Sequence, residues 1–172
     1  DRIRQGRRVG GQLADALGIS ELTAGLLSQR GFSNADDARR FLTPRIDDLL
    51  SPFGLADMSV AVDRILRAIA NQERIVVHGD YDVDGVTSTV ILRRALELLG
   101  ANVTHFIPER FRDGYGLQPA SLERLHAEGA AVVVSVDCGI RGVEAAATAR
   151  TLGIDLIITD HHEPDAELPA AY

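Results

Sequence analysis

Short segments rich in β-branched residues alternate with helical patterns in the second half of the chain, and this alternation most constrains the fold. The expected strands are residues 75–79, 102–107, 131–136 and 154–159. The expected helices are residues 57–71, 86–99, 119–128 and 141–152. Strands that alternate with helices usually pair in parallel through right-handed crossovers. The sequence therefore predicts an α/β fold, with a parallel sheet flanked by helices.

The first third of the chain has a different pattern. Residues 11–30 and 34–43 show the helical spacing of apolar side chains. Residues 44–54 contain two prolines and are typical of a linker. We therefore expect a helical lead-in and linker over residues 1–54 and an α/β domain over residues 55–172.

Three aspartates at alternate positions, Asp80, Asp82 and Asp84, follow the first predicted strand. Carboxylates crowded at the end of a strand repel one another, and cations among their oxygens would stabilise them. His78 lies four residues before Asp82, close enough to add a nitrogen ligand. The segment therefore indicates a divalent-metal site.

Two other interpretations of these aspartates can be weighed. The pattern Asp-x-Asp-x-Asp-Gly also begins the EF-hand calcium loop, which follows a helix and has a glutamate at position twelve. Here a strand precedes the pattern, and the twelfth residue counted from Asp80 is Ile91, so the EF-hand is excluded. A polar turn that caps a helix from Thr87 onward would explain one aspartate, but it explains three and a histidine poorly.

Two further strand ends carry the same kinds of side chain. Asp137-Cys138-Gly139 follows the third predicted strand, and Asp160-His161-His162 follows the fourth. The carboxyl ends of parallel strands share one edge of a sheet, where ligands bind in such folds. We therefore expect one metal site built from several strand ends. The adjacent histidines can bind the same ion only if the backbone bends between them.

Composition sets limits on the class of protein. The chain has 172 residues and 45% hydrophobic residues, and no apolar stretch approaches the ~20 residues of a membrane span. Its single cysteine, Cys138, forbids an internal disulfide and fits a reducing cytoplasm, and we interpret it as a small buried residue beside the site. The net charge of −7 argues mildly against a nucleic-acid partner, although bound cations would offset part of it.

The sequences HGDYDVDG (78–85), VDCG (136–139) and TDHH (159–162) resemble the first three motifs of the DHH phosphoesterase superfamily. The surrounding segments LLSQRGFSNADDARRFLTP, DMSVAVDRILRAI and FIPERFRDGYGL are similar to those of RecJ-type exonucleases within it. The resemblance covers nearly the whole chain. It implies a single-stranded-DNA-specific 5′–3′ exonuclease of DNA repair and recombination.

The resemblance also implies two-metal hydrolysis of a phosphodiester. Asp137 would then bridge the two ions. His78 and Asp82 would bind one ion, and Asp84 and His161 would bind the other.

The other site residues have supporting or alternative roles. Asp80 would be a supporting or alternative metal ligand. Histidine ligands favour Mn²⁺ over Mg²⁺ on chemical grounds. His162 either contacts the phosphate, which would place it with His161 and Asp137 in the catalytic set, or it holds Asp160 or a strand carbonyl.

The segment before the third predicted helix is the best candidate for substrate contact. Arg110 could hold a phosphate, and Tyr115 in the Gly114–Leu117 loop, next to Gly116, could stack on a base. The alternative is a glycine-flanked turn in which Tyr115 packs against the sheet.

The superfamily has a further aspartate motif and a second domain after the third motif, and neither lies in the ten residues after His162. We therefore expect a fragment with weak or no nuclease activity of its own. Two alternatives remain open: another DHH phosphoesterase (a nano-RNase, a phosphoadenosine phosphate phosphatase or a pyrophosphatase), or a non-catalytic DHH scaffold. The expected partner is single-stranded DNA, and we expect a cytoplasmic monomer without membrane contact.

Overall fold

The computed structural model describes residues 2–109 and 112–172, with side chains from residue 10 onward. The chain divides into two compact units, Asp1–Gly54 and Leu55–Tyr172. Within the described residues, the structure contains no helix that is both long and apolar enough to cross a membrane.

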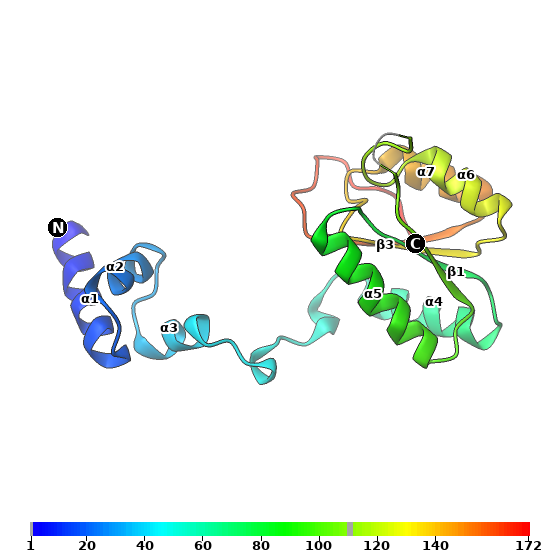
Figure 1. Ribbon diagram of the computed structural model, residues 1–172. Helices are drawn as coiled ribbons and strands as arrows, with labels where there is room; N and C mark the ends of the chain where they lie inside the picture. Colours follow the sequence, from blue (N-terminus) through cyan, green and yellow to red (C-terminus); the bar gives the residue numbers. More distant parts are fainter. Residues whose placement is uncertain (1, 110–111) are drawn as a thin grey trace. The chain divides into compact units, whose positions relative to one another are not determined.

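The first unit is helical, with α1 (Arg2–Leu17), α2 (Glu21–Gln29) and α3 (Ala35–Leu42) (Figure 1). The helical pattern of residues 11–30 is interrupted at Gly18, whose φ of 66° ends α1. Ser20 then caps α2, because its hydroxyl accepts a hydrogen bond from the backbone N–H of Thr23. The small core of this unit consists of Leu13, Ala14, Ala24, Leu27 and Ala38. Two short 3₁₀ turns without buried residues follow, at Ile46–Asp48 and Pro52–Gly54.

The second unit is built on a parallel sheet, as the sequence predicts. Its strands are β1 (Ile75–His78), β2 (Val103–Phe106), β3 (Val132–Val136) and β4 (Asp155–Thr159). The strand order is β2-β1-β3-β4, and every pair is parallel. The chain moves outward from β1 to β2 and from β3 to β4 in opposite directions. The topological switch point, where such folds bind ligands, therefore lies between β1 and β3.

Helices cover both faces of this sheet (Figure 1). They are α4 (Met58–Ala70), α5 (Val83–Leu98), α6 (Pro119–Ala127) and α7 (Val143–Leu152). Residues of α6 and α7 pack with Val76 and Val133 on one face. Residues of α4 and α5 pack with Val77 and Val134 on the other face. Because β1 and β3 are buried on both sides, their sequences are continuously apolar rather than alternating.

Helix α5 begins at Val83, three residues earlier than the sequence pattern predicts. The reason is Asp82, whose Oδ1 accepts a hydrogen bond from the backbone N–H of Gly85 at 2.9 Å and caps the helix. Asp84 therefore lies in the first helical turn and not in a preceding loop.

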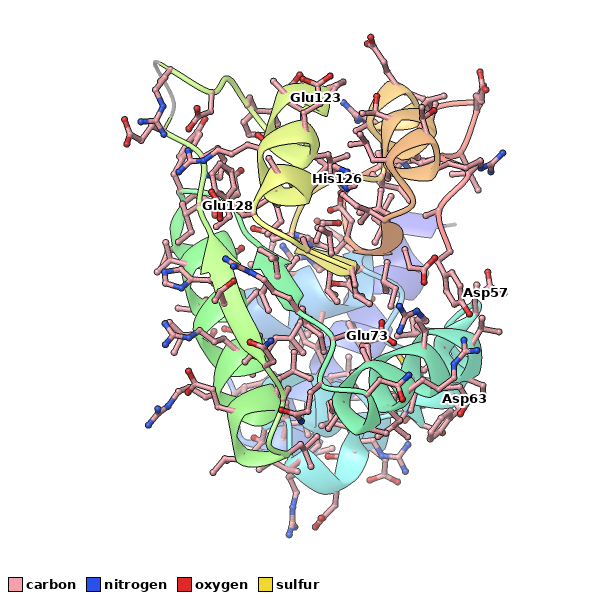
Figure 2. All side chains as sticks on the ribbon, turned by 90° about the vertical axis from the view of Figure 1, so that its right-hand side faces the viewer. Asp57, Asp63, Glu73, Glu123, His126 and Glu128 are labelled. Carbon is pink, nitrogen blue, oxygen red and sulfur yellow. The ribbon has the colours of Figure 1, made fainter. Side chains whose placement is uncertain are left out.

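A buried ion pair ties α4 to the sheet. The guanidinium of Arg64 donates to Asp155 of β4 and to Glu73, which lies beside α4 in Figure 2, with both N–O distances at 2.5 Å. Arg64 is 8% exposed, so its two carboxylate partners satisfy a charge that water reaches poorly.

Candidate metal centre

The carboxyl end of β1 carries the most deeply buried residue of the candidate centre. The imidazole of His78 is fully buried, and its Nε2 has no hydrogen-bond partner among the described residues. Burial lowers the pKa of His78 to about 4, so the ring is neutral at pH 7. A buried, neutral imidazole with an unpartnered nitrogen fits a metal ligand.

The loop after β1 packs tightly against the start of α5. Asp80 is 1% exposed, and its Oδ1 accepts a hydrogen bond from the backbone N–H of Tyr81 at 2.7 Å. A Cβ on Gly85 would lie 2.6 Å from the backbone nitrogen of Asp80, so only glycine allows this approach. Asp82 and Asp84, by contrast, are exposed on the first turn of α5.

Asp137 follows β3 in an unusual conformation. Its φ is 62°, in the left-handed region that few residues other than glycine adopt. Asp137 is 8% exposed, and one of its carboxylate oxygens lies 2.9 Å from Nε2 of His161. Burial and the neighbouring carboxylates of Asp82 and Asp84 raise the pKa of Asp137. The three aspartates therefore share one negative electrostatic environment, which a cation would stabilise.

Asp160 organises the turn after β4. Its Oδ1 accepts hydrogen bonds from the backbone N–H groups of His161 and His162 and from Nδ1 of His162 at 2.7 Å. Its Oδ2 accepts from the backbone N–H of Ile140 in the loop after β3. Although burial alone would raise the pKa of Asp160, these hydrogen bonds lower it. The same contact with Asp160 raises the pKa of His162.

This turn supplies the backbone bend that two adjacent histidine ligands require. The rings of His161 and His162 lie 4.8 Å apart, and one potential ligand atom from each lies within 4.8 Å of an Asp137 oxygen. Among the described residues, these three form the group whose ligand atoms are closest together. His78, Asp80, Asp82 and Asp84 surround the same edge from β1 and α5 but lie outside that group.

A cleft of about 310 Å³ opens beside the metal candidates. Tyr115 and Gly116 line it together with His162, so three of the four residues expected to contact substrate face one space. Tyr115 is 59% exposed, and its ring lies 6.2 Å from that of Tyr81 in an edge-on arrangement. The fourth expected residue, Arg110, lies outside the described residues.

Two residues close to the centre, Asp160 and Arg141, are not among the metal, catalytic or substrate-binding residues predicted from the sequence. Asp160 was considered only as one possible partner of His162, and the structure shows this contact between Oδ1 of Asp160 and Nδ1 of His162. Arg141 also lines the cleft, and its Nε donates to the carbonyl of Glu163 at 2.9 Å. Nothing in the sequence separates Arg141 from the exposed arginines of the helices. His105 and His126 lie away from the centre: His105 is on β2, and His126 is on the exposed side of α6 (Figure 2).

The chain is similar in sequence to known proteins over most of its length. The chain is 45% identical over 157 residues to the single-stranded-DNA-specific exonuclease RecJ of Bacillus subtilis, covering 91% of this chain and 20% of that protein. It is 40% identical over 147 residues to RecJ of Escherichia coli, covering 85% of this chain and 25% of that protein. The chain thus spans about a fifth to a quarter of the length of these relatives.

A solved structure of a RecJ protein has a similar fold. RecJ of Thermus thermophilus in complex with Mn²⁺ superposes with a TM-score of 0.71 at 30% identity, covering 95% of this chain and 22% of that one. The sequence profile of the DHH family, N-terminal domain, matches residues 74–172, which hold every strand and all three motifs. The chain therefore belongs to the DHH family.

Proposed function

We propose that this chain carries the metal-binding part of a phosphodiesterase which, in the whole protein, digests single-stranded DNA from the 5′ end. Its similarity to the RecJ exonucleases supports the substrate and the reaction. The Thermus thermophilus protein has been crystallised with Mn²⁺ and with Mg²⁺, which supports a divalent cation as the cofactor. A role in DNA repair and recombination, in the cytoplasm, belongs to the same proposal.

The observation that carries the proposal is the convergence of unlike metal ligands from three strand ends. The histidine nitrogens of His161 and His162 approach the carboxylate of Asp137, and the unpartnered Nε2 of His78 is buried at the neighbouring strand end. In this proposal His78, Asp82 and Asp137 would hold one divalent cation, and Asp84, His161 and Asp137 would hold the other. Asp80 supports the loop that holds Asp82, because Oδ1 of its buried carboxylate accepts the backbone N–H of Tyr81.

When bound, divalent cations would activate a water molecule and stabilise the leaving oxygen of the phosphodiester. The protein's own residues position the substrate. His162 lines the cleft while Asp160 holds its Nδ1, so its other ring nitrogen, Nε2, would be available to a phosphate bound there. Tyr115 offers an exposed ring on which a base of a single strand can stack without sequence preference. Gly116, which is buried, allows the backbone of this loop to approach the nucleotide closely.

Calorimetric titration of the chain with Mn²⁺ tests the metal site. Asp137→Asn is the matched variant, because asparagine tolerates the left-handed conformation and keeps the shape of the side chain. We expect the wild-type chain to bind Mn²⁺ and the variant to lose most of that binding. Equal binding by the two chains would contradict the proposed centre.

The substrate is tested on the whole protein. Long single-stranded DNA, a dinucleotide and pyrophosphate, offered side by side, separate an exonuclease from other DHH phosphoesterases and from a non-catalytic scaffold. We expect degradation of the long strand, and its loss in Asp137→Asn. The 172-residue chain by itself should degrade DNA weakly or not at all, since it spans a fifth to a quarter of the relatives' length.

A further inference from the structure

A buried contact joins the histidine of β1 to the cysteine after β3. Nδ1 of His78 lies 3.7 Å from Sγ of Cys138, although the two residues are 60 positions apart in sequence. The contact exists because β1 and β3 are neighbours, with His78 opposite Ser135, so that the chain leaving β3 passes the His78 ring. Cys138 is 3% exposed and His78 is fully buried, so water does not compete for this contact.

The hydrogen-bonding capacity of the two side chains decides which ring nitrogen carries hydrogen. Sγ of Cys138 also lies 4.0 Å from the carbonyl oxygens of His78 and Gly79. The single S–H hydrogen can therefore point to a carbonyl while the sulfur accepts Nδ1–H from the ring. In this arrangement each of the two hydrogens has an acceptor. Nε2 is then left with a free lone pair, and it is the ring nitrogen without a partner among the described residues.

The opposite tautomer leaves a donor unsatisfied. If hydrogen were on Nε2, the S–H group would have to donate to Nδ1, and it could not also donate to a carbonyl. The Nε2–H group would then be buried without an acceptor, and an orphaned N–H is rarer in folded proteins than an under-used acceptor. The first arrangement is therefore favoured.

We propose that Cys138 is a positioning residue for the metal centre: its Sγ accepts Nδ1–H of His78 and so presents the Nε2 lone pair to a divalent cation. This inference rests on the proposed function only in taking that cation as the ligand. It gives Cys138 a defined role, whereas the sequence alone indicates no more than a small buried residue.

The expected effect of Cys138 on metal affinity follows from its contact with His78, because Cys138 would act on the metal only through that histidine. Groups that orient a metal-binding histidine typically contribute 10- to 100-fold to metal affinity. Cys138→Ala removes the sulfur acceptor, and we expect Mn²⁺ binding to weaken by about that factor. Cys138→Ser keeps one acceptor and one donor at the position and should restore most of the affinity.

Two measurements test the inference. ¹⁵N–¹H correlation spectra of the metal-free chain report which ring nitrogen of His78 carries hydrogen, with His78→Gln identifying the signal. Mn²⁺ calorimetry then compares the alanine and serine variants with wild type. The control is Val132→Ala, which removes a buried side chain at the amino end of the same strand, far from the site.

The expected result is an Nδ1–H tautomer in wild type and in Cys138→Ser, its loss in Cys138→Ala, and an unchanged tautomer in Val132→Ala. An Nε2–H tautomer in wild type, or wild-type Mn²⁺ affinity in Cys138→Ala, would overturn the inference. If the wild-type chain binds no Mn²⁺, the proposed metal function fails in this chain. In that case the tautomer of His78, which is measured without metal, still tests whether Cys138 fixes the hydrogen on Nδ1.

Discussion

Replacement of Gly85 by alanine probes the contact on which the loop of aspartates depends. An added Cβ would lie 2.6 Å from the nitrogen of Asp80 and 2.7 Å from its Cα and Cβ. Cα and the backbone nitrogen cannot rotate away, so either the loop after β1 or the first turn of α5 must shift.

The magnitude follows from two opposing effects. Overpacking typically costs 1–3 kcal/mol, and contacts with fixed backbone atoms place this case at about 3 kcal/mol. Alanine is about 1 kcal/mol better than glycine within a helix. We therefore expect Gly85→Ala to lower the free energy of unfolding by about 2 kcal/mol.

Urea unfolding followed by circular dichroism measures this change. The control is Val86→Ala, the next residue of the same turn, which is 39% exposed and should change stability by no more than about 0.5 kcal/mol. The Gly85→Ala chain should also bind Mn²⁺ more weakly, because the shift moves Asp82 relative to Asp137. A variant as stable as wild type would refute the argument that Asp80 and α5 are held by this approach.

Three further predictions concern charge, packing and substrate. Asp137→Asn should make the metal-free chain more stable at neutral pH, because the raised pKa of Asp137 means that its ionised form is disfavoured in the fold. Urea unfolding repeated across pH should show this gain in stability vanish below pH 3.8, the ordinary pKa of the group, where the carboxyl is protonated in both the folded and the unfolded chain. Arg64→Met should lower the free energy of unfolding in urea by about 1–3 kcal/mol, because it leaves two partly buried carboxylates without their cation. Arg94→Met on the surface should lower it by less than about 1 kcal/mol. Tyr115→Ala should weaken binding of oligo-dT to the chain by about 5- to 150-fold in fluorescence anisotropy, which corresponds to a stacking loss of about 1–3 kcal/mol, while Tyr172→Ala outside the cleft should not weaken it. The first argument would be contradicted if Asp137→Asn were still more stable than wild type at pH 3, and the second if Arg64→Met did not change the free energy of unfolding. The third would be contradicted if the Tyr115→Ala and wild-type chains gave the same anisotropy curve.

The strands and the edge where the motifs meet could be predicted from sequence. β1 and β3 are runs of β-branched residues, and this signal is strong because both faces of each strand are buried. Once the strands are parallel, their carboxyl ends share an edge, so Asp80, Asp137 and Asp160 had to lie on one side of the domain. Periodicity and topology were sufficient for this part.

The local geometry of the centre could not be predicted in this way. The start of α5 depends on a single hydrogen bond from Gly85 to Asp82, and neighbouring aspartates could have capped the helix equally well. The bend at His161 and His162 depends on the orientation of the Asp160 side chain. The contact between His78 and Cys138 needs the exact pairing of β1 with β3. These features depend on ångström-scale packing, which a residue pattern does not carry.

The charge of the ligand that this centre binds can be inferred from the features that destabilise the metal-free fold. Asp137 has a strained backbone and a carboxylate whose ionisation is opposed by burial and by Asp82 and Asp84. His78 has a buried nitrogen without a partner. Both costs occur at the carboxyl edge of the sheet, at the ends of the neighbouring strands β1 and β3. A cation would offset the carboxylate repulsion and accept the free lone pair of His78, whereas an anion would increase the repulsion and could not use the lone pair. The same residues that destabilise the metal-free fold therefore favour the binding of a positively charged ligand.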